Sequence, residues 1–201
     1  MTANAPPRIY KATGAVRTAI LDAVEDILRE EGYAAVSSRK VAARAGLSSK
    51  LVHYHYKTMD QLFLAVFNRV EERHFHYLAQ TIASPLPLRA LWQFLTSPTA
   101  PRMHRELRAL ATHNDELRGL IARSTERTRS ITTALLSRVL ADAGVDESRL
   151  PPVAVALFLE SVSRLMMSES ALGTELGHAE AARVIERWLE TLLATGREAL
   201  P

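Results

Sequence analysis

The chain of 201 residues contains no cysteine, which excludes disulfide scaffolds, thiolate metal sites and cysteine nucleophiles. It also lacks a long apolar run, because the longest, Val153 to Leu159, is far shorter than the roughly 20 residues that span a bilayer. The amino-terminal residues do not form the continuous apolar stretch of a signal peptide. These absences predict a protein without a membrane-spanning segment and with a cytoplasmic location.

Acidic residues are absent from residues 32–59. Residues 1–60 hold nine Lys and Arg against six Asp and Glu, whereas residues 61–201 hold sixteen of each, so the formal excess of +3 comes from the first sixty residues. The cations of the acid-free segment are Arg39, Lys40, Arg44, Lys50 and Lys57. Such a segment predicts an electropositive surface that suits a polyanion.

Histidine is present in seven copies, which raises the question of a metal site. His53 and His55 are two residues apart, as are His74 and His76. On a helix this spacing points the two rings about 200° apart, so neither pair can close a chelate. The sequence also has no glycine-rich phosphate loop and no nucleophile elbow. We therefore expect no metal, no cofactor and no enzymatic activity.

Apolar periodicity and capping residues predict helices along the chain, and no alternating strand pattern is present. An amphipathic helix is expected to begin at Thr13 and end at Gly32. Ser37 and Ser48 are placed to cap two short helices, and Gly46 supplies a turn between them. This order of helix, turn and helix predicts a helix-turn-helix module.

The predicted fold is all-α, with about nine helices in two domains. The first, residues 1–60, would be a three-helix DNA-binding domain with a flexible basic arm at residues 1–12. The second, residues 61–201, would be a helical ligand-binding and dimerisation domain whose first helix starts at the capping-box sequence Thr58 to Gln61. Its later helices are expected around residues 90–94, 102–113, 115–143, 152–172 and 179–195.

The second helix of a helix-turn-helix enters the major groove of DNA. Lys50, His53, Tyr54 and Lys57 recur at i, i+3, i+4 and i+7, which at helical pitch places two cations, an imidazole and a phenol on one face. Arg39 and Lys50 are the candidates for bidentate contacts with guanine, while Lys57 is a candidate for phosphate contact. The pattern predicts a DNA-binding protein.

The segment from Val153 to Leu159 is apolar around the whole circumference of its helix, which indicates burial on two sides. A central core helix would explain this pattern, and so would a subunit interface made with the last helix. The interface is favoured, because two-fold DNA readers hold their recognition helices roughly 34–36 Å apart. The residues expected there are Val155, Phe158, Leu159, Val162, Met166, Ile185, Trp188 and Leu192.

Polar residues within inward-facing apolar stripes suggest a cavity with a few hydrogen-bonding groups. Aromatic residues at helical spacing could line it, although such residues more often form plain core, and both interpretations stay open. A ligand would act by stabilising one spacing of the two recognition helices over another. The candidate pocket residues are Trp92, Phe94, Ser124, Thr128, Phe158 and Ser161.

The segment from Ile20 to Leu62 resembles the helix-turn-helix of the TetR family of bacterial transcriptional regulators. The resemblance is carried by a first helix that ends EEGY and by the following SSRKVAARAGLSSKLVHYHYKTMDQL. His53 stands where the family usually has Tyr, and Met59 where Lys is common. The carboxy-terminal helices match only in number, length and the final dimerising pair.

This resemblance implies a homodimeric repressor, or less often an activator, that binds a pseudo-palindromic double-stranded DNA operator and is released by a small-molecule effector. It also implies that Lys57 reaches phosphate and that Val52 and Tyr56 are buried. The residues it implies at the DNA are Arg39, Ser48, Ser49, Lys50, Leu51, His53, Tyr54 and His55. The alternative is a helical interaction module whose basic helix binds an acidic partner without sequence-specific DNA binding.

Overall fold

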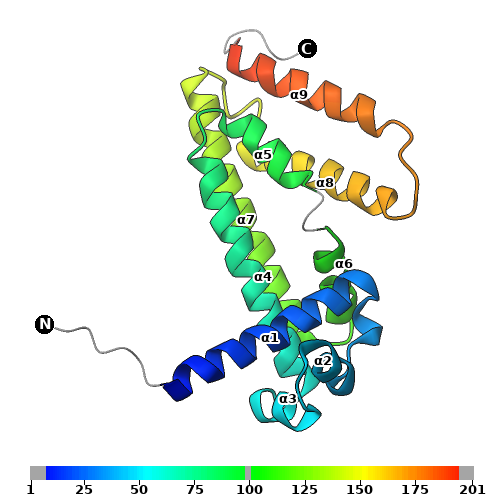
Figure 1. The fold of residues 1–201 in the computed structure, drawn as a ribbon. Coiled ribbons are helices and arrows are strands. Elements are labelled where there is room, and N and C mark those ends of the chain that lie inside the picture. Colours follow the sequence, from blue (N-terminus) through cyan, green and yellow to red (C-terminus); the bar gives the residue numbers. More distant parts are fainter. Residues whose placement is uncertain (1–7, 98–100, 195–201) are drawn as a thin grey trace, which may run out of the picture. The chain divides into compact units, whose positions relative to one another are not determined.

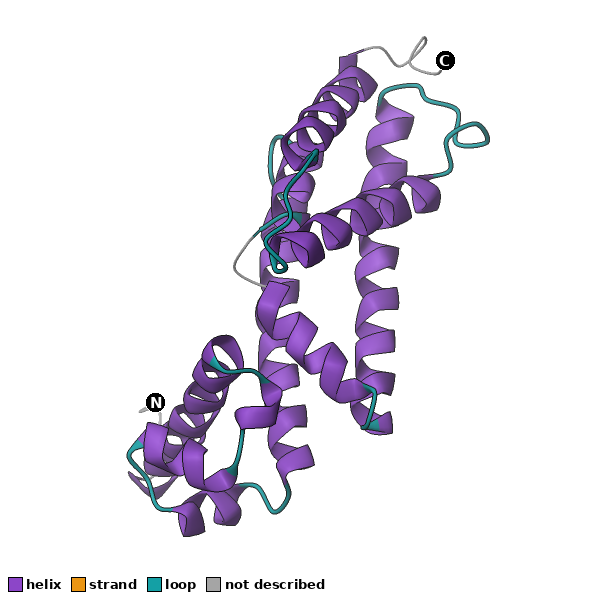
Figure 2. Ribbon diagram, turned by 90° about the vertical axis from the view of Figure 1, so that its right-hand side faces the viewer, coloured by secondary structure: helices purple, strands orange, loops and turns teal. Residues whose placement is uncertain are grey.

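The computed structural model describes residues 8–97 and 101–194, and within them it contains helices and loops but no strand (Figure 1; Figure 2). The all-α prediction is confirmed, and no helix in this part of the chain is long and apolar enough to cross a membrane. The helices are α1 (Arg8–Glu30), the 3-10 helix η1 (Tyr33–Ala35), α2 (Ser38–Ala45), α3 (Ser49–His55), α4 (Met59–Ile82), α5 (Pro87–Leu95), α6 (Pro101–Ala111), α7 (Asp115–Asp142), α8 (Pro152–Ser170) and α9 (His178–Ala194).

The chain forms two compact units. The first comprises residues 1–71 and 102–121, and the second comprises residues 72–101 and 122–201. The long helices α4 and α7 therefore contribute to both units, and the first unit includes α6. This division differs from the expected boundary near residue 60, because α6 buries apolar side chains in the core of the helix-turn-helix unit.

The core of the first unit joins α1, α2, α3, the start of α4, α6 and the start of α7. Glu25 of α1 is buried among these apolar side chains, and Arg69 of α4 compensates its charge through a hydrogen bond from Nε to Oε1 of 2.7 Å. Arg69 also pairs with Asp22 at 2.8 Å. A buried carboxylate is tolerated when it is paired in this way, so these contacts fix α4 against α1.

The predicted caps of the helix-turn-helix are confirmed. The Ser37 hydroxyl accepts a hydrogen bond from the backbone N–H of Lys40, and the Ser48 hydroxyl accepts one from Leu51, both at 3.3 Å. Gly46 ends α2 in the left-handed conformation, with φ 67° and ψ 29°. A side chain would be strained at this φ, so the turn that leads from α2 into α3 favours glycine.

Helix α1 begins at Arg8, five residues before the expected start at Thr13. Pro6 and Pro7 precede this start, and proline is compatible with a helix beginning but not with its interior. Residues 8–12, expected as part of a flexible arm, are therefore helical, whereas residues 1–7 of that arm lie outside the described residues.

The predicted start of α4 is confirmed. The Thr58 hydroxyl accepts a hydrogen bond from the N–H of Gln61 at 3.1 Å. The Gln61 side chain in turn accepts one from the N–H of Lys57 at 2.9 Å. This reciprocal pair is a capping box shifted by one residue, because the glutamine reaches the residue before the cap. It ties Lys57 to the first turn of α4.

In the second unit, α5 packs against both α8 and α9 (Figure 1). The core contains Leu88, Leu91, Trp92, Leu135, Leu136, Val139, Leu140, Val155, Ala156, Leu159, Ile185, Leu189 and Leu192. A polar contact joins α7 to α8, since Nη2 of Arg129 donates to Oε2 of the buried Glu160 at 2.9 Å. Arg164 adds a second positive charge at 3.5 Å from the same oxygen.

Candidate nucleic-acid interface

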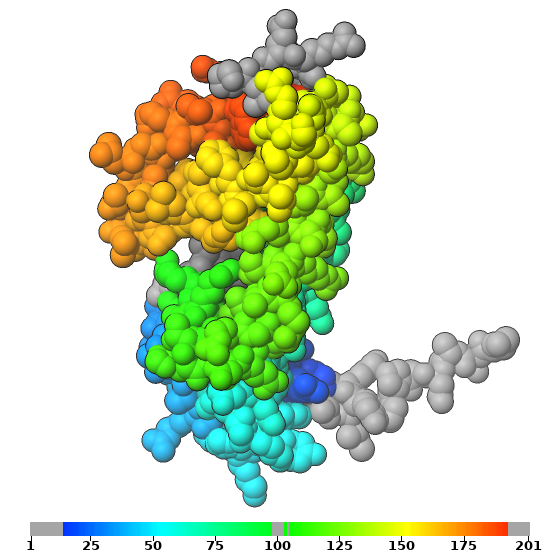
Figure 3. Space-filling model, turned by 180° about the vertical axis from the view of Figure 1, so that it is seen from behind, coloured from blue at the N-terminus to red at the C-terminus, as the bar shows by residue number. Residues whose placement is uncertain are grey.

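Helix α3 presents one face to the core and one to solvent. Val52 and Tyr56 are buried, as the family resemblance implies. Lys50, His53 and Tyr54 are exposed, with Tyr54 at 69% of its full accessibility. The surface of residues 45–60 is visible in cyan in Figure 3. A cation, an imidazole and a phenol therefore share the solvent face of the predicted recognition helix.

Lys57 does not lie on this helix, which corrects the expected i+7 position. Helix α3 ends at His55, and Tyr56 adopts an extended conformation with φ −133° and ψ 105°. Burial of the Tyr56 ring and the bond from Lys57 N–H to Gln61 turn the chain into α4 at this point. The Lys57 ammonium still lies over the exposed Tyr54 ring, 5.5 Å from its centroid, so the two side chains remain neighbours.

Two of the five cations in the acid-free segment are paired with the end of α1. Lys40 forms an ion pair with Glu31, and Arg44 pairs with Glu30 at 2.9 Å and with Glu31 at 3.6 Å. The negative charges of Glu30 and Glu31 thus neutralise two of the five positive charges in the acid-free segment. These pairs attach α2 to the end of α1, and they make Lys40 and Arg44 weaker candidates for contact with a polyanion.

Arg39, Lys50 and Lys57 are exposed, and none of them has an ion pair within the part of the chain that the structure describes. Arg39 lies in the first turn of α2, Lys50 in the first turn of α3, and Lys57 immediately before α4. Three uncompensated cations at the amino-terminal ends of three helices favour an anionic partner, because helix amino termini carry partial positive charge of their own.

The remaining predicted contact residues are accessible to different degrees. Ser48 is exposed, while Ser49, Leu51 and His55 are half-buried. The Ser48 oxygen is engaged as the cap of α3, and its hydroxyl proton can still be donated outward. Direct contact of each of these side chains with DNA stays a prediction.

Sequence reasoning missed Arg17. This exposed residue of α1 places its guanidinium carbon 5.6 Å from the centroid of the Tyr56 ring, at the end of α3. It lies fifteen residues before the acid-free segment, so no local pattern connects it with α3. Only the packing of α1 in the fold brings this cation beside Tyr56, the residue that follows α3.

Lys57 gives a prediction about salt dependence. We expect Lys57→Ala to flatten the plot of log affinity against log salt by about one unit for each bound copy, because one phosphate contact is lost. Fluorescence anisotropy with a duplex at several salt concentrations measures this slope. Arg118→Ala is the control, because this exposed α7 cation is paired with Asp115 and lies outside the candidate interface. An unchanged slope for Lys57→Ala would remove this residue from the interface.

Two of the residues expected at an effector pocket, Thr128 and Phe94, contact the same side chain, His74. Thr128 of α7 lies 3.0 Å from Nε2 of His74, whose ring stacks at an angle on Phe94 with centroids 5.1 Å apart. Trp92 is part of the apolar core, Ser124 is half-buried and Ser161 is exposed. Phe158 lines a separate groove. His74 is an addition that the sequence did not indicate.

Burial lowers the pKa of His74 below its ordinary value of 6.5. The neutral ring is therefore favoured in the folded state, and its contribution to stability is complete above pH 6.5. As the pH falls through 6.5 the unfolded chain binds a proton first, so the free energy of unfolding should fall until folded His74 is protonated too. In urea unfolding experiments between pH 8 and pH 5.5, the free energy of unfolding should fall less steeply with decreasing pH for His74→Gln than for the wild type. Parallel curves for the two proteins would contradict this.

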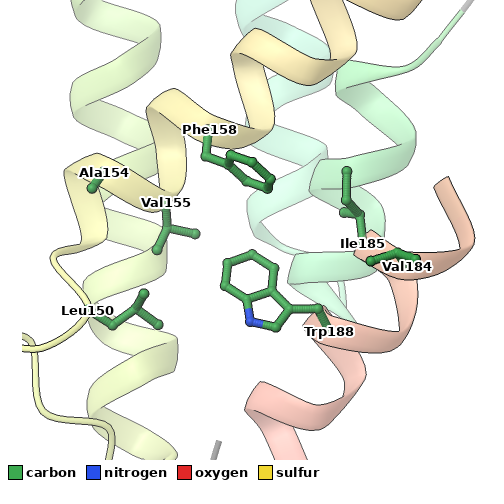
Figure 4. A pocket seen from close by; sticks show the side chains of 7 residues that line it. All are labelled: Leu150, Ala154, Val155, Phe158, Val184, Ile185 and Trp188. Atoms are coloured by element: carbon green, nitrogen blue, oxygen red, sulfur yellow. The ribbon is translucent and has the colours of Figure 1, made fainter. Parts of the chain in front are cut away.

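An apolar groove of about 400 Å³ lies between α8 and α9 (Figure 4). Phe158 and Trp188 meet edge to face in it, with ring centroids 6.1 Å apart and planes at 83°. The lining residues are Leu150, Ala154, Val155, Phe158, Val184, Ile185 and Trp188. Phe158 is half exposed, as are Val153, Leu157 and Leu165 on the same helix. An exposed apolar surface of this kind is a candidate interaction site.

The structure divides the residues expected at the subunit interface. Phe158, Val162, Met166 and Trp188 retain exposed surface. The other four are at most 4% exposed and form part of the subunit's own core: Val155, Leu159, Ile185 and Leu192. Helix α8 has a buried apolar face and an exposed apolar face, which is why its sequence is apolar around the full circumference. The core interpretation is confirmed for the buried face, and the subunit interface stays a prediction for the exposed face.

Comparison with known proteins agrees with these features. Residues 20–66 match the family model of bacterial regulatory proteins, tetR family. An HTH-type transcriptional repressor of Mycobacterium tuberculosis and an HTH-type transcriptional regulator of Mycobacterium bovis are each 44% identical over 55 residues, which span 27% of this chain and 29% of each relative.

Solved structures resemble the fold over most of the chain. A TetR transcription regulator from Haloarcula marismortui superposes with a TM-score of 0.75 at 19% identity, covering 89% of this chain and 98% of the other. A regulator of the TetR/AcrR family from Thermobifida fusca gives 0.62 at 19% identity, covering 88% and 96%. Residues 20–66 are therefore similar to the DNA-binding segment of the TetR family of bacterial regulators, and the fold over most of the chain is similar to that of solved structures described as TetR-type regulators.

Proposed function

We propose that the protein is a ligand-responsive repressor that binds a pseudo-palindromic DNA operator as a homodimer. The observation that carries the proposal is the solvent face of the helix-turn-helix, where Arg39, Lys50 and Lys57 are exposed without an ion pair in the described residues. Phosphate contacts from such cations fix the register on DNA, and a few side chains of α3 read base edges. Repression is supported by the name of the M. tuberculosis relative, which is called a repressor.

Dimerisation through α8 and α9 is supported by the exposed apolar side chains that line the groove around Phe158 and Trp188. A two-fold dimer would use this same surface on both copies. Each copy would present one α3, and together they would read the two halves of a palindrome.

An effector is supported by polar atoms inside the second unit. The hydroxyl oxygens of Thr132 and Thr133 and one carboxylate oxygen of Glu160 are buried, and none has a hydrogen-bond partner among the described residues. Buried polar atoms in proteins are usually satisfied by a protein group, a water or a ligand.

Selection of bound sites from random duplexes tests the DNA-binding part. We expect the enriched sequences to share two inverted half-sites with centres about one helical turn, or a multiple of it, apart. Enrichment of no motif, together with equal binding of all duplexes, would contradict the proposal and favour an interaction module that binds acidic partners. A screen for small molecules that release the selected duplex then tests ligand response.

A further inference from the structure

The end of α1 requires an unusual backbone. The N–H groups of Glu31 and Gly32 both donate to the carbonyl of Ile27, at 2.8 and 3.1 Å, and close the helix. Gly32 then has φ 86° and ψ 172°, which L side chains rarely adopt, and η1 follows directly. Gly32 precedes η1 as its cap residue but has no side chain, so the first N–H of η1 must find its acceptor elsewhere.

A carboxylate from α6 supplies this acceptor. The N–H of Tyr33 donates to Oε2 of Glu106 at 2.9 Å, across 73 residues of sequence. The same oxygen would lie only 2.9 Å from a Cβ added at Gly32, closer than real Cβ contacts. Glycine at this position thus serves both the positive φ and the close approach of Glu106.

The turn that Glu106 holds is connected to the DNA-reading helix. Glu30 and Glu31, the two residues before Gly32, form the ion pairs with Arg44 and Lys40 of α2. Helix α2 leads through the left-handed Gly46 into α3. Helix α6 also enters the same core as α2 and α3 through Met103, Leu107 and Ala111. A shift of the turn would therefore be transmitted to α2 and from there to α3.

We propose that Glu106 is a positioning residue for DNA reading: by accepting the Tyr33 N–H it fixes the turn after α1, and with it the orientation of α2 and α3. The proposal depends on the proposed DNA-binding function. A charged acceptor such as this carboxylate makes a stronger hydrogen bond than a neutral one. If α3 is correctly oriented in only a fraction of the molecules, the apparent affinity for DNA falls in proportion to that fraction.

The test compares Glu106→Ala with Glu106→Gln, both assayed at a temperature where circular dichroism shows them folded. Glu106→Ala should weaken binding to the selected operator about tenfold while binding to a scrambled duplex stays unchanged, because only a correctly oriented α3 reads bases. Glu106→Gln keeps an oxygen acceptor and should restore operator affinity to within about twofold of wild type. A stability loss in Glu106→Ala without a change in the ratio of operator to scrambled affinity would overturn the proposal, as would equal ratios in all three proteins.

Two measurements stay informative if the DNA-binding function itself fails. Amide hydrogen exchange of Tyr33 should accelerate in Glu106→Ala and remain slow in Glu106→Gln, and equally fast exchange in the wild type would overturn the contact.

Gly32→Ala should lower the urea midpoint in the wild-type background by more than in the Glu106→Ala background, because the clash with the carboxylate is absent in the second background. Equal shifts in the two backgrounds would contradict the close approach. A wild type that shows no preference for any duplex would refute the proposed function without affecting these two results.

Discussion

Replacing Phe158 with Asp should convert the proposed dimer into monomers. Phe158 is 50% exposed and meets Trp188 in the apolar groove between α8 and α9. In each copy the substitution removes roughly 1.5–3 kcal/mol of free energy from apolar burial and places a charge in the interface instead. Two-fold symmetry applies this change twice, so we expect the dimer dissociation constant to rise at least ~100-fold. Sedimentation velocity over a concentration series measures this change.

Operator affinity should fall together with dimerisation, because separate monomers no longer present two linked copies of α3. Tyr77→Asp is the matched control, since it also places an acid at an exposed aromatic position of the second unit, on α4 and outside the groove. It should leave both the dimer and operator binding intact. A Phe158→Asp protein that still sediments as a dimer would show that another surface joins the subunits.

Replacing Lys50 with Ala should abolish most of the preference for the operator. Lys50 is exposed in the first turn of α3 and has no ion pair among the described residues, so its ammonium is free to reach a base edge. A good base contact is worth about 1–3 kcal/mol, and two copies read one operator, so affinity should fall by a factor of roughly 30 or more. Anisotropy titrations with the selected duplex measure this loss.

Two controls, the Lys50→Arg variant and a scrambled duplex, distinguish contact of Lys50 with a base from contact with a phosphate. Lys50→Arg keeps a donor for guanine and should keep most of the operator affinity, whereas Lys50→Ala should bind a scrambled duplex nearly as well as the wild type does. If Lys50→Ala weakened binding to every duplex by the same factor, Lys50 would be a phosphate contact. Unchanged binding to the operator would remove this side chain from the interface altogether.

Local sequence signals were sufficient for the caps and the turn of the helix-turn-helix. Ser37, Ser48 and Gly46 act over three or four residues, so their capping roles could be derived without knowledge of the fold, and the structure has all three. The burial of Val52 and Tyr56, implied by the family resemblance, is also observed. The all-α class followed because no segment combined alternation with turn residues.

Contacts between distant segments could not be derived in this way. The expected stacking of Lys57 on α3 assumed a helix longer by two residues, but burial of Tyr56 ends it at His55. The sequence showed that α8 is apolar around its whole circumference. Only the packing of α5, α7 and α9 against it determines that Val155 and Leu159 face the core while Phe158 faces outward. Tertiary packing determines these outcomes, and it has no signature within a short window of sequence.

The site residues that were missed share this cause. Glu106 meets Tyr33 across 73 residues, and His74 meets Thr128 across 54. Nothing in the immediate sequence of Glu106 distinguishes it from any other acid on an amphipathic helix. Gly32 was expected to end the first helix, but the second reason for glycine, the close approach of Glu106, becomes clear only when α6 is in place.

The central claim is that two copies of α3 read one operator together, and the most direct test is a titration of a selected palindromic duplex against the same duplex with one half-site scrambled. Sedimentation should find two protein chains on the intact duplex, and the intact duplex should bind much more tightly than the half-scrambled one. One chain per duplex, or equal affinity for both duplexes, would contradict the account.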